Sequence, residues 1–288
     1  MDEGILAIGN CESLEKPARL ISFKEKFMKN RLLERDWRFI LDSIYLLYKM
    51  DSLDSFKRSS LEFLSSLIQA DQSMFFETSQ DTSRTVIFKS CVSRGEEPKF
   101  MDEFLSGTFN DDPYFRRWGF FPKTTTFRDT DMMPEYYRLN TKIFREIYSK
   151  QGIYYGLRSY LVQDSKAIGN ICLFNHKERG DFSEDDVNLL DLVAPHITLK
   201  FAWLLQEAEK GQEDAVLDRK LLEYGLTQRE RELAKLILSG ADDEEVADKL
   251  CISRATFHKH ISNIYRKIGV RSRVQFFSLF APSSSSCS

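Results

Sequence analysis

Residues 253–269, SRATFHKHISNIYRKIG, decide the fold of the C-terminal part of this chain. Apolar side chains recur in this stretch at the three- and four-residue spacing of a single α-helical stripe. They are Phe257, Ile261, Ile264 and Ile268. Because successive helical residues are rotated by about 100°, the opposite face carries Lys259, Ser262 and Arg266. The stretch therefore predicts a helix that buries one side and exposes the other.

The exposed side of this predicted helix is basic. Residues 254–273 contain six Lys or Arg and no Asp or Glu, whereas residues 226–249 contain seven acids and four bases. A helix that only faces water usually mixes both signs of charge. The partition favours a polyanion partner, with basic charge for solubility alone as the alternative.

Length and composition indicate a globular protein whose basic character is local. The 288 residues suffice for two domains, and the 42% hydrophobic content can build a core. The net charge is −3. The five cysteines contain no CxxC pair, which predicts reduced thiols rather than disulfides or a zinc site. No secretory signal and no run of ~18 apolar residues is evident, so we expect a cytoplasmic protein with no membrane partner.

The hydrophobic period predicts an α+β fold with two different parts. The expected elements of the first part are helices over 32–48 and 53–68, paired strands over 73–79 and 84–92, an irregular aromatic segment over 100–155, and a hairpin with strands over 156–163 and 167–175. They indicate an α/β sandwich around one antiparallel sheet. The second part, from Leu226 to Phe280, is expected to be all-α, with four short helices.

A long helix is expected to link these parts. It starts within FSEDD (182–186), with Ser183 as N-cap and acids in its first turn, and should end at about Glu209. It has two apolar rows: one can cover the sheet, and the other either packs against an identical helix or is buried in the same chain. The resulting boundaries are a flexible arm over 1–30, a sensory or dimerisation domain over 31–209, a linker over 210–222, a helical domain over 223–281 and a disordered tail over 282–288.

The helical part carries the motifs of a known DNA-binding domain. Residues 226–273, LTQRERELAKLILSGADDEEVADKLCISRATFHKHISNIYRKIGVRSR, closely resemble the helix-turn-helix domain of the LuxR/FixJ family of bacterial transcriptional regulators. The motifs are L-T-x-R-E-x-E, I-S-x-x-T-x-x-x-H-I and K-I-G-V-x-S-R. The resemblance implies that the third helix lies in the major groove of double-stranded DNA.

The resemblance also assigns roles to single residues of that helix. Those expected to face base edges are His258, Lys259 and Ser262, and those expected at the DNA backbone are Thr256, Asn263, Arg266 and Lys267. The family commonly has T-V-K-x-H where this chain has Thr256-Phe257-His258-Lys259-His260. The usual base preference therefore does not carry over.

The element order of the first part, ending in a hairpin and the helix after FSEDD, resembles a GAF domain. Such modules act as sensory or dimerisation units ahead of LuxR-type domains, which implies a small-molecule effector. An apolar pocket with a few polar anchors is expected among Tyr114, Trp118, Phe120, Tyr154, Tyr155 and Arg158, with arginine as an anion partner. The alternative is that these aromatic residues only fill the core.

No enzyme motif such as GxSxG, a P-loop or HExxH is present, so we expect no catalytic residues, metal or cofactor. Cys91 and Cys172 lack a nearby base in the sequence and are expected to be buried strand residues. We predict a sequence-specific transcriptional regulator, controlled by a small molecule or a partner. The alternative is a constitutive regulator whose first domain only dimerises or binds a protein.

A homodimer is expected from the second apolar row of the long helix and from the last helix. The last helix has more apolar side chains than so small a domain can bury. They are Val274, Phe276, Phe277 and Phe280. If the protein is an activator, RNA polymerase is a further partner; repression remains equally open.

Overall fold

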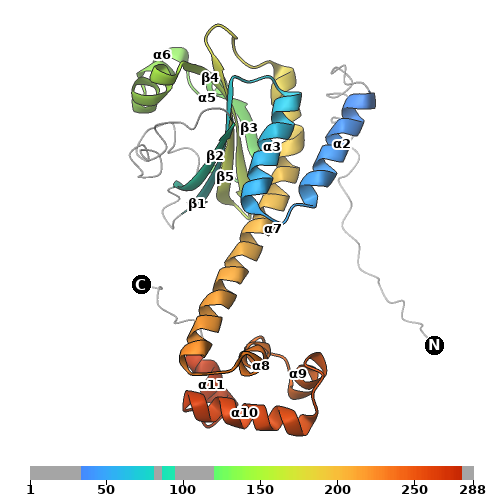
Figure 1. Ribbon diagram of the computed structural model, residues 1–288. Helices are drawn as coiled ribbons and strands as arrows, with labels where there is room; N and C mark the ends of the chain where they lie inside the picture. The colour runs from blue at the N-terminus through green and yellow to red at the C-terminus, as the bar shows by residue number, and fades with distance from the viewer. Residues whose placement is uncertain (1–33, 81–85, 95–119, 281–288) are drawn as a thin grey trace, which may run out of the picture. The chain divides into compact units, whose positions relative to one another are not determined.

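The computed structural model describes residues 34–80, 86–94 and 120–280 (Figure 1). The chain divides after Leu204 into two compact units. The first contains an antiparallel sheet with helices and the second is all helical, which confirms the expected α+β class. The predicted arm over 1–30 and tail over 282–288 lie outside the described residues.

The first unit is built on one five-stranded sheet in the order β2-β1-β5-β4-β3, with every neighbouring pair antiparallel. The strands are β1 (Gln72–Gln80), β2 (Val86–Arg94), β3 (Thr125–Arg128), β4 (Ile153–Gln163) and β5 (Lys166–His176). Both predicted strand pairs are confirmed. The short β3 was not predicted, because its four residues are too few to show an alternating pattern.

The β4–β5 hairpin turns on only two residues. Asp164 and Ser165 have φ angles of 50° and 61°, as both central residues of a type I′ turn require. The second strand therefore begins at Lys166, one residue before the predicted start.

Strand alternation places apolar side chains on both faces of the sheet. Met74 and Phe76 lie in the cluster beneath α5 (Asp129–Met132), α6 (Glu135–Asn140) and the π-helical turn η2 (Phe144–Tyr148). Phe75 points the other way, and its ring centroid lies 4.9 Å from that of Phe201 on α7. Helix α3 (Leu53–Leu67) covers this second face with α7, and α2 (Glu34–Tyr48) packs outside α3 (Figure 1).

Helix α7 (Glu184–Glu223) has 40 residues and passes the unit boundary without interruption. The predicted end at about Glu209 is therefore wrong, and residues 210–222, predicted as a linker, are helical. Most of these residues are good helix formers (Leu, Lys, Arg, Gln, Glu and Ala), and the single Gly211 costs only about 1 kcal/mol. Further along, Leu221 is completely buried in the core of the second unit.

The two apolar rows of α7 have different environments. Residues of the first row, such as Leu190, Ile197 and Phe201, are buried against the sheet, as expected. In the second row Leu189 is buried, whereas Leu199 is 56% and Trp203 46% exposed. Burial of both rows inside one chain is therefore excluded for these two side chains.

The second unit contains the four predicted helices, α8 (Gln228–Leu238), α9 (Asp243–Lys249), α10 (Arg254–Ile268) and α11 (Arg273–Phe280). Its core contains Phe257, Ile264 and Ile268 of the predicted stripe, with Ile261 packed against it. Phe276 of α11 is also fully buried, which corrects the expectation that it lies on a surface; Val274 is 75% exposed.

Candidate nucleic-acid interface

Local hydrogen bonds begin and end the helices of the second unit. The backbone N–H of Thr227 donates to Glu230 Oε2 over 2.8 Å, and the Thr227 hydroxyl accepts from the backbone N–H of Glu230, which confirms the predicted capping box. Ser253 Oγ accepts from the backbone N–H of Thr256 at 3.2 Å and starts α10. Gly269, with φ of 84°, ends α10 in the left-handed region that glycine favours.

A tight turn sets α10 across α9. Cys251 lies in it with φ of 51°, and its N–H donates to the carbonyl of Asp248 at 3.0 Å. The N–H of Ile252 donates to the carbonyl of Ala247 at 2.9 Å. Helix, tight turn and longer helix form a helix-turn-helix.

The solvent side of α10 carries the residues predicted from the sequence. His258, Lys259, Ser262, Arg266 and Lys267 are exposed. Thr256 and Asn263 are half-buried. Asn263 Oδ1 accepts a hydrogen bond from Arg266 at 3.1 Å, which orients that guanidinium. The seven side chains thus lie along one helix, as predicted.

Acids of the preceding helices neutralise three of the six bases in 254–273. Arg254 pairs with Glu244, Arg273 with Asp243 at 2.8 Å, and Lys267 with Glu230 at 2.6 Å. Within the described part of the chain, the other three form no ion pair. They are Lys259, Arg266 and Arg271. The positive charge that remains unpaired is therefore smaller than the sequence count indicates.

Lys267 differs from its predicted role at the DNA backbone. Its ammonium donates to Glu230 Oε2 and, at 3.1 Å, to the carbonyl of Gly225. It therefore ties α10 to the start of α8. A phosphate contact would have to replace this pair.

Glu230 occupies a crowded position between the two helices, with a side chain only 6% exposed. Burial acts to raise the pKa of its carboxyl, but hydrogen bonds from Lys267 and Thr227 outweigh burial and hold the pKa below its usual range. The carboxylate is therefore an ionised structural element rather than a titrating group near neutral pH.

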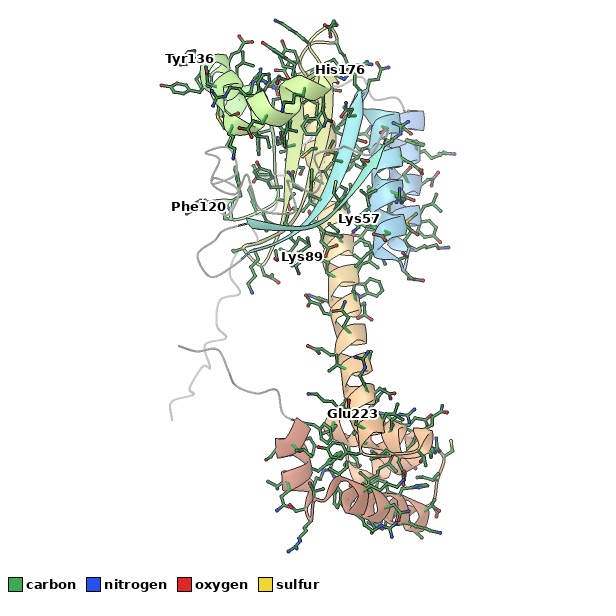
Figure 2. The ribbon with its side chains drawn as sticks, turned by 60° about the vertical axis from the view of Figure 1, so that its left-hand side comes forward. Lys57, Lys89, Phe120, Tyr136, His176 and Glu223 are labelled. Carbon is green, nitrogen blue, oxygen red and sulfur yellow. The ribbon has the colours of Figure 1, made fainter. Side chains whose placement is uncertain are left out.

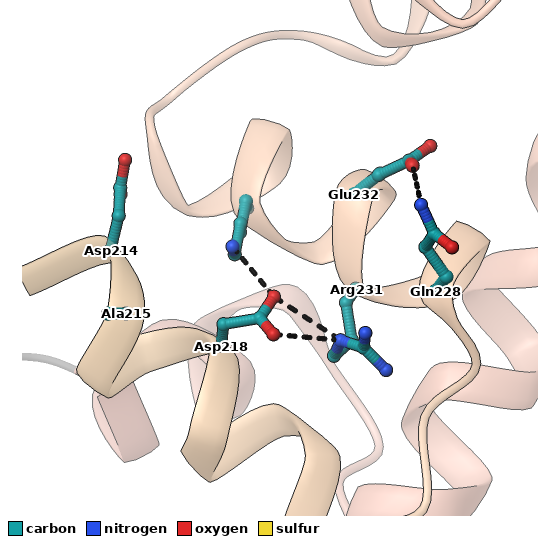
Figure 3. A pocket seen from close by; sticks show the side chains of 7 residues that line it. Asp214, Ala215, Asp218, Gln228, Arg231 and Glu232 are labelled. Carbon is teal, nitrogen blue, oxygen red and sulfur yellow. Dashed lines mark hydrogen bonds and ion pairs between the residues drawn. The ribbon is translucent and has the colours of Figure 1, made fainter. Parts of the chain in front are cut away.

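The end of α7 is bonded to α8 around an open groove of about 480 Å³ (Figure 3). Asp218 of α7 pairs with Lys235 at 2.7 Å and with Arg231 at 3.2 Å. These hydrogen bonds, that from Lys235 foremost, lower the pKa of the Asp218 carboxyl. With Leu221 in the core, the last turns of α7 belong structurally to the helix-turn-helix unit.

Four of the six residues predicted to bind an effector lie among the described residues. Tyr114 and Trp118 lie outside the described residues, and Phe120 is 65% exposed. Tyr154 and Tyr155 are half-buried, with ring centroids 4.8 Å apart. Of these described residues, Tyr154 lines the pocket reported below.

Arg158 is part of the interior of the first unit. Its Nε donates to Asp129 Oδ1 at 2.7 Å and its Nη2 to Asp129 Oδ2 at 3.2 Å. Nη2 also donates to the hydroxyl of Tyr148 at 2.9 Å. The side chain is only 1% exposed. This corrects its prediction as an anion partner for an effector, because its anion is Asp129.

Cys172 also contacts this buried pair. Arg158 Nη1 lies 3.0 Å from Cys172 Sγ, so the structure supplies the basic neighbour that the sequence lacks. Burial nevertheless dominates over the guanidinium and raises the pKa of Cys172 to about 11. The thiol stays protonated and unreactive, as expected of a buried strand residue.

A pocket of about 320 Å³ opens at one end of the sheet. It lies between η2, the 3₁₀ turn η3 (Ser149–Gln151), the start of β4 and the end of β5. Its lining includes Phe144, Gly152, Ile153, Tyr154, His176 and Lys177. Only Tyr154 was predicted as a ligand residue. Gly152, left-handed with φ of 70°, is the one local signal of the sharp turn that forms the pocket.

Among the described residues, no group of three or more His, Cys, Asp or Glu could hold a metal ion. Across the same parts of the chain, none of the helices combines the length and hydropathy that a membrane span requires.

The helix-turn-helix unit matches a known family. Residues 225–280 match the family model GerE, described as bacterial regulatory proteins of the luxR family. The spore germination protein GerE of Bacillus subtilis is 44% identical over 50 residues, which cover 17% of this chain and 68% of that protein.

Two further comparisons extend beyond this unit. An Aeromonas salmonicida protein, described as an HTH-type transcriptional regulator, is 30% identical over 117 residues, or 36% of this chain; the chain spans only 60% of its length. The VqsR LBD domain from Pseudomonas aeruginosa aligns with 59% of this chain and 96% of its own, with 14% identity and a TM-score of 0.46.

The capping box, the tight turn, the exposed basic side of α10 and the 44% identity to GerE agree. The chain therefore belongs to the luxR family of bacterial regulatory proteins.

Proposed function

We propose that this protein regulates transcription by binding a specific double-stranded DNA sequence with α10 in the major groove. The carrying observation is the side of α10 on which Lys259 and Arg266 are exposed and form no ion pair with any described residue. Phosphates attract such cations without regard to sequence, whereas side chains that reach base edges discriminate between sequences. The family relation supports the same docking of the helix.

Position along α10 separates the two roles. Lys259 lies in the first half of the helix, and His258 and Ser262 flank it on the exposed side. In a helix-turn-helix, base contacts come mainly from the N-terminal half of the recognition helix. Arg266 lies in the last turn, where the helix leaves the groove and phosphates are nearer.

Lys259→Ala should therefore weaken binding to the specific site by about 1–3 kcal/mol and change binding to random duplex much less. Arg266→Ala should weaken binding to both duplexes. It should also reduce the slope of log affinity against log salt concentration by about one, because one phosphate contact is lost. The measurement is fluorescence anisotropy over a salt series, with a site selected from a random duplex library. Lys220→Ala, an exposed base on α7, is the control. If Lys259→Ala lost the same binding free energy on the specific and the random duplex, Lys259 would not contact a base edge.

We further propose that the protein acts as a homodimer, which would place two half-sites about one DNA turn apart. Support comes from exposed apolar side chains on α2, where Leu41 is 63%, Tyr45 59% and Leu46 59% exposed. Leu199 and Trp203 of α7 are further exposed apolar residues of the first unit. In the second unit, Val274 of α11 is an apolar side chain that is 75% exposed.

Light scattering of the full chain at micromolar concentration should give twice the monomer mass. Leu46→Lys and Val274→Lys, tested separately, should show which helix carries the contact, because an introduced charge is costly in an apolar interface. Thr125→Lys, at a polar position of β3, is the control. A monomer in all conditions, including saturating specific duplex, would refute the dimer.

The first unit is proposed to control DNA binding through a bound small molecule, with the pocket at the start of β4 and the end of β5 as its site. The other candidate is a constitutive regulator whose first unit only dimerises or binds another protein. The exposed apolar residues of α2 support that second candidate. Contact with RNA polymerase is proposed only if the protein activates transcription.

A further inference from the structure

We propose that the pocket at the start of β4 and the end of β5 binds a small carboxylate with an aromatic or short alkyl body. This inference rests on the proposed effector control and assigns its chemistry. The pocket volume of about 320 Å³ lies at the lower end of the range for ligand sites, which suits a metabolite rather than a large cofactor.

One wall of the pocket is apolar and held rigidly. Phe144 and Ile153 are 9% and 2% exposed, and the ring centroid of Phe144 lies 5.9 Å from that of Tyr154 in an edge-to-face arrangement. The Tyr154 hydroxyl donates to Glu135, which fixes the ring further. Such a wall accommodates a flat ring or a short alkyl chain.

The other side carries a buried ring nitrogen that lacks a partner. His176 Nε2 is buried and forms no hydrogen bond, although the backbone N–H of His176 donates to Asp71 at 2.9 Å. Figure 2 shows His176 at this end of the first unit. A buried ring nitrogen without a partner is unfavourable and is explained by a ligand that supplies one.

Charge next to this nitrogen favours an anion. Lys177 is exposed, its ammonium lies 4.9 Å from the centre of the Tyr154 ring, and it forms no ion pair with a described residue. Behind the same ring, the Arg138 guanidinium lies 4.9 Å from the centroid; its Nε and Nη2 are buried without hydrogen bonds. A ligand ammonium would be repelled by both cations.

Three acids lie nearby and do not reverse this preference. Asp71, which accepts the backbone N–H of His176, already pairs with Arg179 at 2.6 Å. Glu178, the one acid in the pocket lining, is exposed, so water and salt screen its charge. Glu135 already accepts the Tyr154 hydroxyl. A carboxylate held by His176 and Lys177, with its apolar body on Phe144 and Tyr154, satisfies the unpaired donors and fills the pocket.

The test uses the full chain with phenylacetate and hexanoate as probes, and phenylacetamide and hexanamide as uncharged matches. Isothermal titration calorimetry should show carboxylate binding at least about tenfold tighter than amide binding, since charge-assisted hydrogen bonds are about twice as strong as neutral ones. Lys177→Met, which keeps the aliphatic stem, should weaken carboxylate binding about tenfold. Lys150→Met, an exposed lysine outside the pocket lining, should have no effect.

Ser149→Phe should fill the pocket and abolish binding of both probes, while circular dichroism reports an intact fold. Three results would each overturn the inference: equal binding of acid and amide, a carboxylate affinity of Lys177→Met equal to that of the wild type, or no binding at millimolar probe. DNA anisotropy on the same samples separates the two proposals. Carboxylate binding that leaves DNA affinity unchanged would retain the site and refute effector control.

Discussion

Replacing Asp129 with asparagine should lower the free energy of unfolding of the first unit by about 3–5 kcal/mol. The carboxylate bonds the Arg158 guanidinium through both oxygens, and the two side chains are 5% and 1% exposed. Asparagine keeps the shape but not the charge. It would leave a cation in the apolar interior without its carboxylate, which costs far more than the pair itself contributes.

The surroundings of Asp129 leave little room for relaxation. Gly156 on β4 faces it so closely that a Cβ built there would lie 2.3 Å from Asp129 Oδ2. Burial raises the pKa of the Asp129 carboxyl, while the charge and hydrogen bonds of Arg158 act in the opposite direction. An ionised carboxylate at this position therefore depends on the arginine, and each side chain requires the other.

Urea unfolding of the full chain, followed by near-ultraviolet circular dichroism, measures the effect. Asp131→Asn is the matched control. The Asp131 side chain, which pairs with Arg128, is 42% exposed, so this pair should contribute less than about 1 kcal/mol. Asp129→Asn combined with Arg158→Met should recover part of the loss, because the buried charge is removed. An Asp129→Asn variant as stable as Asp131→Asn would contradict this account.

The second large effect is expected at Glu230, which combines a helix cap with a pair between helices. Glu230→Ala removes the acceptor of the Thr227 N–H and of the Lys267 ammonium, and should cost the second unit about 2–4 kcal/mol. Glu230→Gln can still accept from Thr227 and should cost about half as much. Glu232→Ala is the control, because the Glu232 side chain that pairs with Arg229 is 42% exposed and such a surface pair contributes little.

The sign of the pH dependence follows from the lowered pKa of Glu230. A carboxyl with a lower pKa in the folded than in the unfolded state stabilises the fold above its ordinary pKa. That stabilisation disappears as pH falls through the lowered value. The difference between wild type and Glu230→Gln, measured by urea unfolding, should therefore be large at about pH 7 and shrink toward about pH 3. A difference independent of pH would contradict the ionic role of Glu230.

Much of the fold could be predicted because its signals are local. The Thr227–Glu230 capping box, Ser253 at the start of α10 and Gly269 at its end act within three or four residues. The stripe from Phe257 to Ile268 and the alternation in β4 and β5 are periodic patterns of one element. The direction in which α10 exposes His258 and Lys259 follows from the same period. The motifs of residues 226–273 then sufficed to predict the family.

Only the tertiary structure decided which charges are neutralised and where a ligand can enter. Arg158 and Asp129 are 29 positions apart, and Lys267 and Glu230 are 37 apart. No helical or strand period relates such residues, because the sheet and the helix packing bring them together. The continuation of α7 through 210–222 likewise depends on Leu221, which is buried in the core that α8–α11 form. Local periodicity thus determined the elements and the exposed side of α10, whereas burial and long-range pairing determined which of its cations form no ion pair with a described residue.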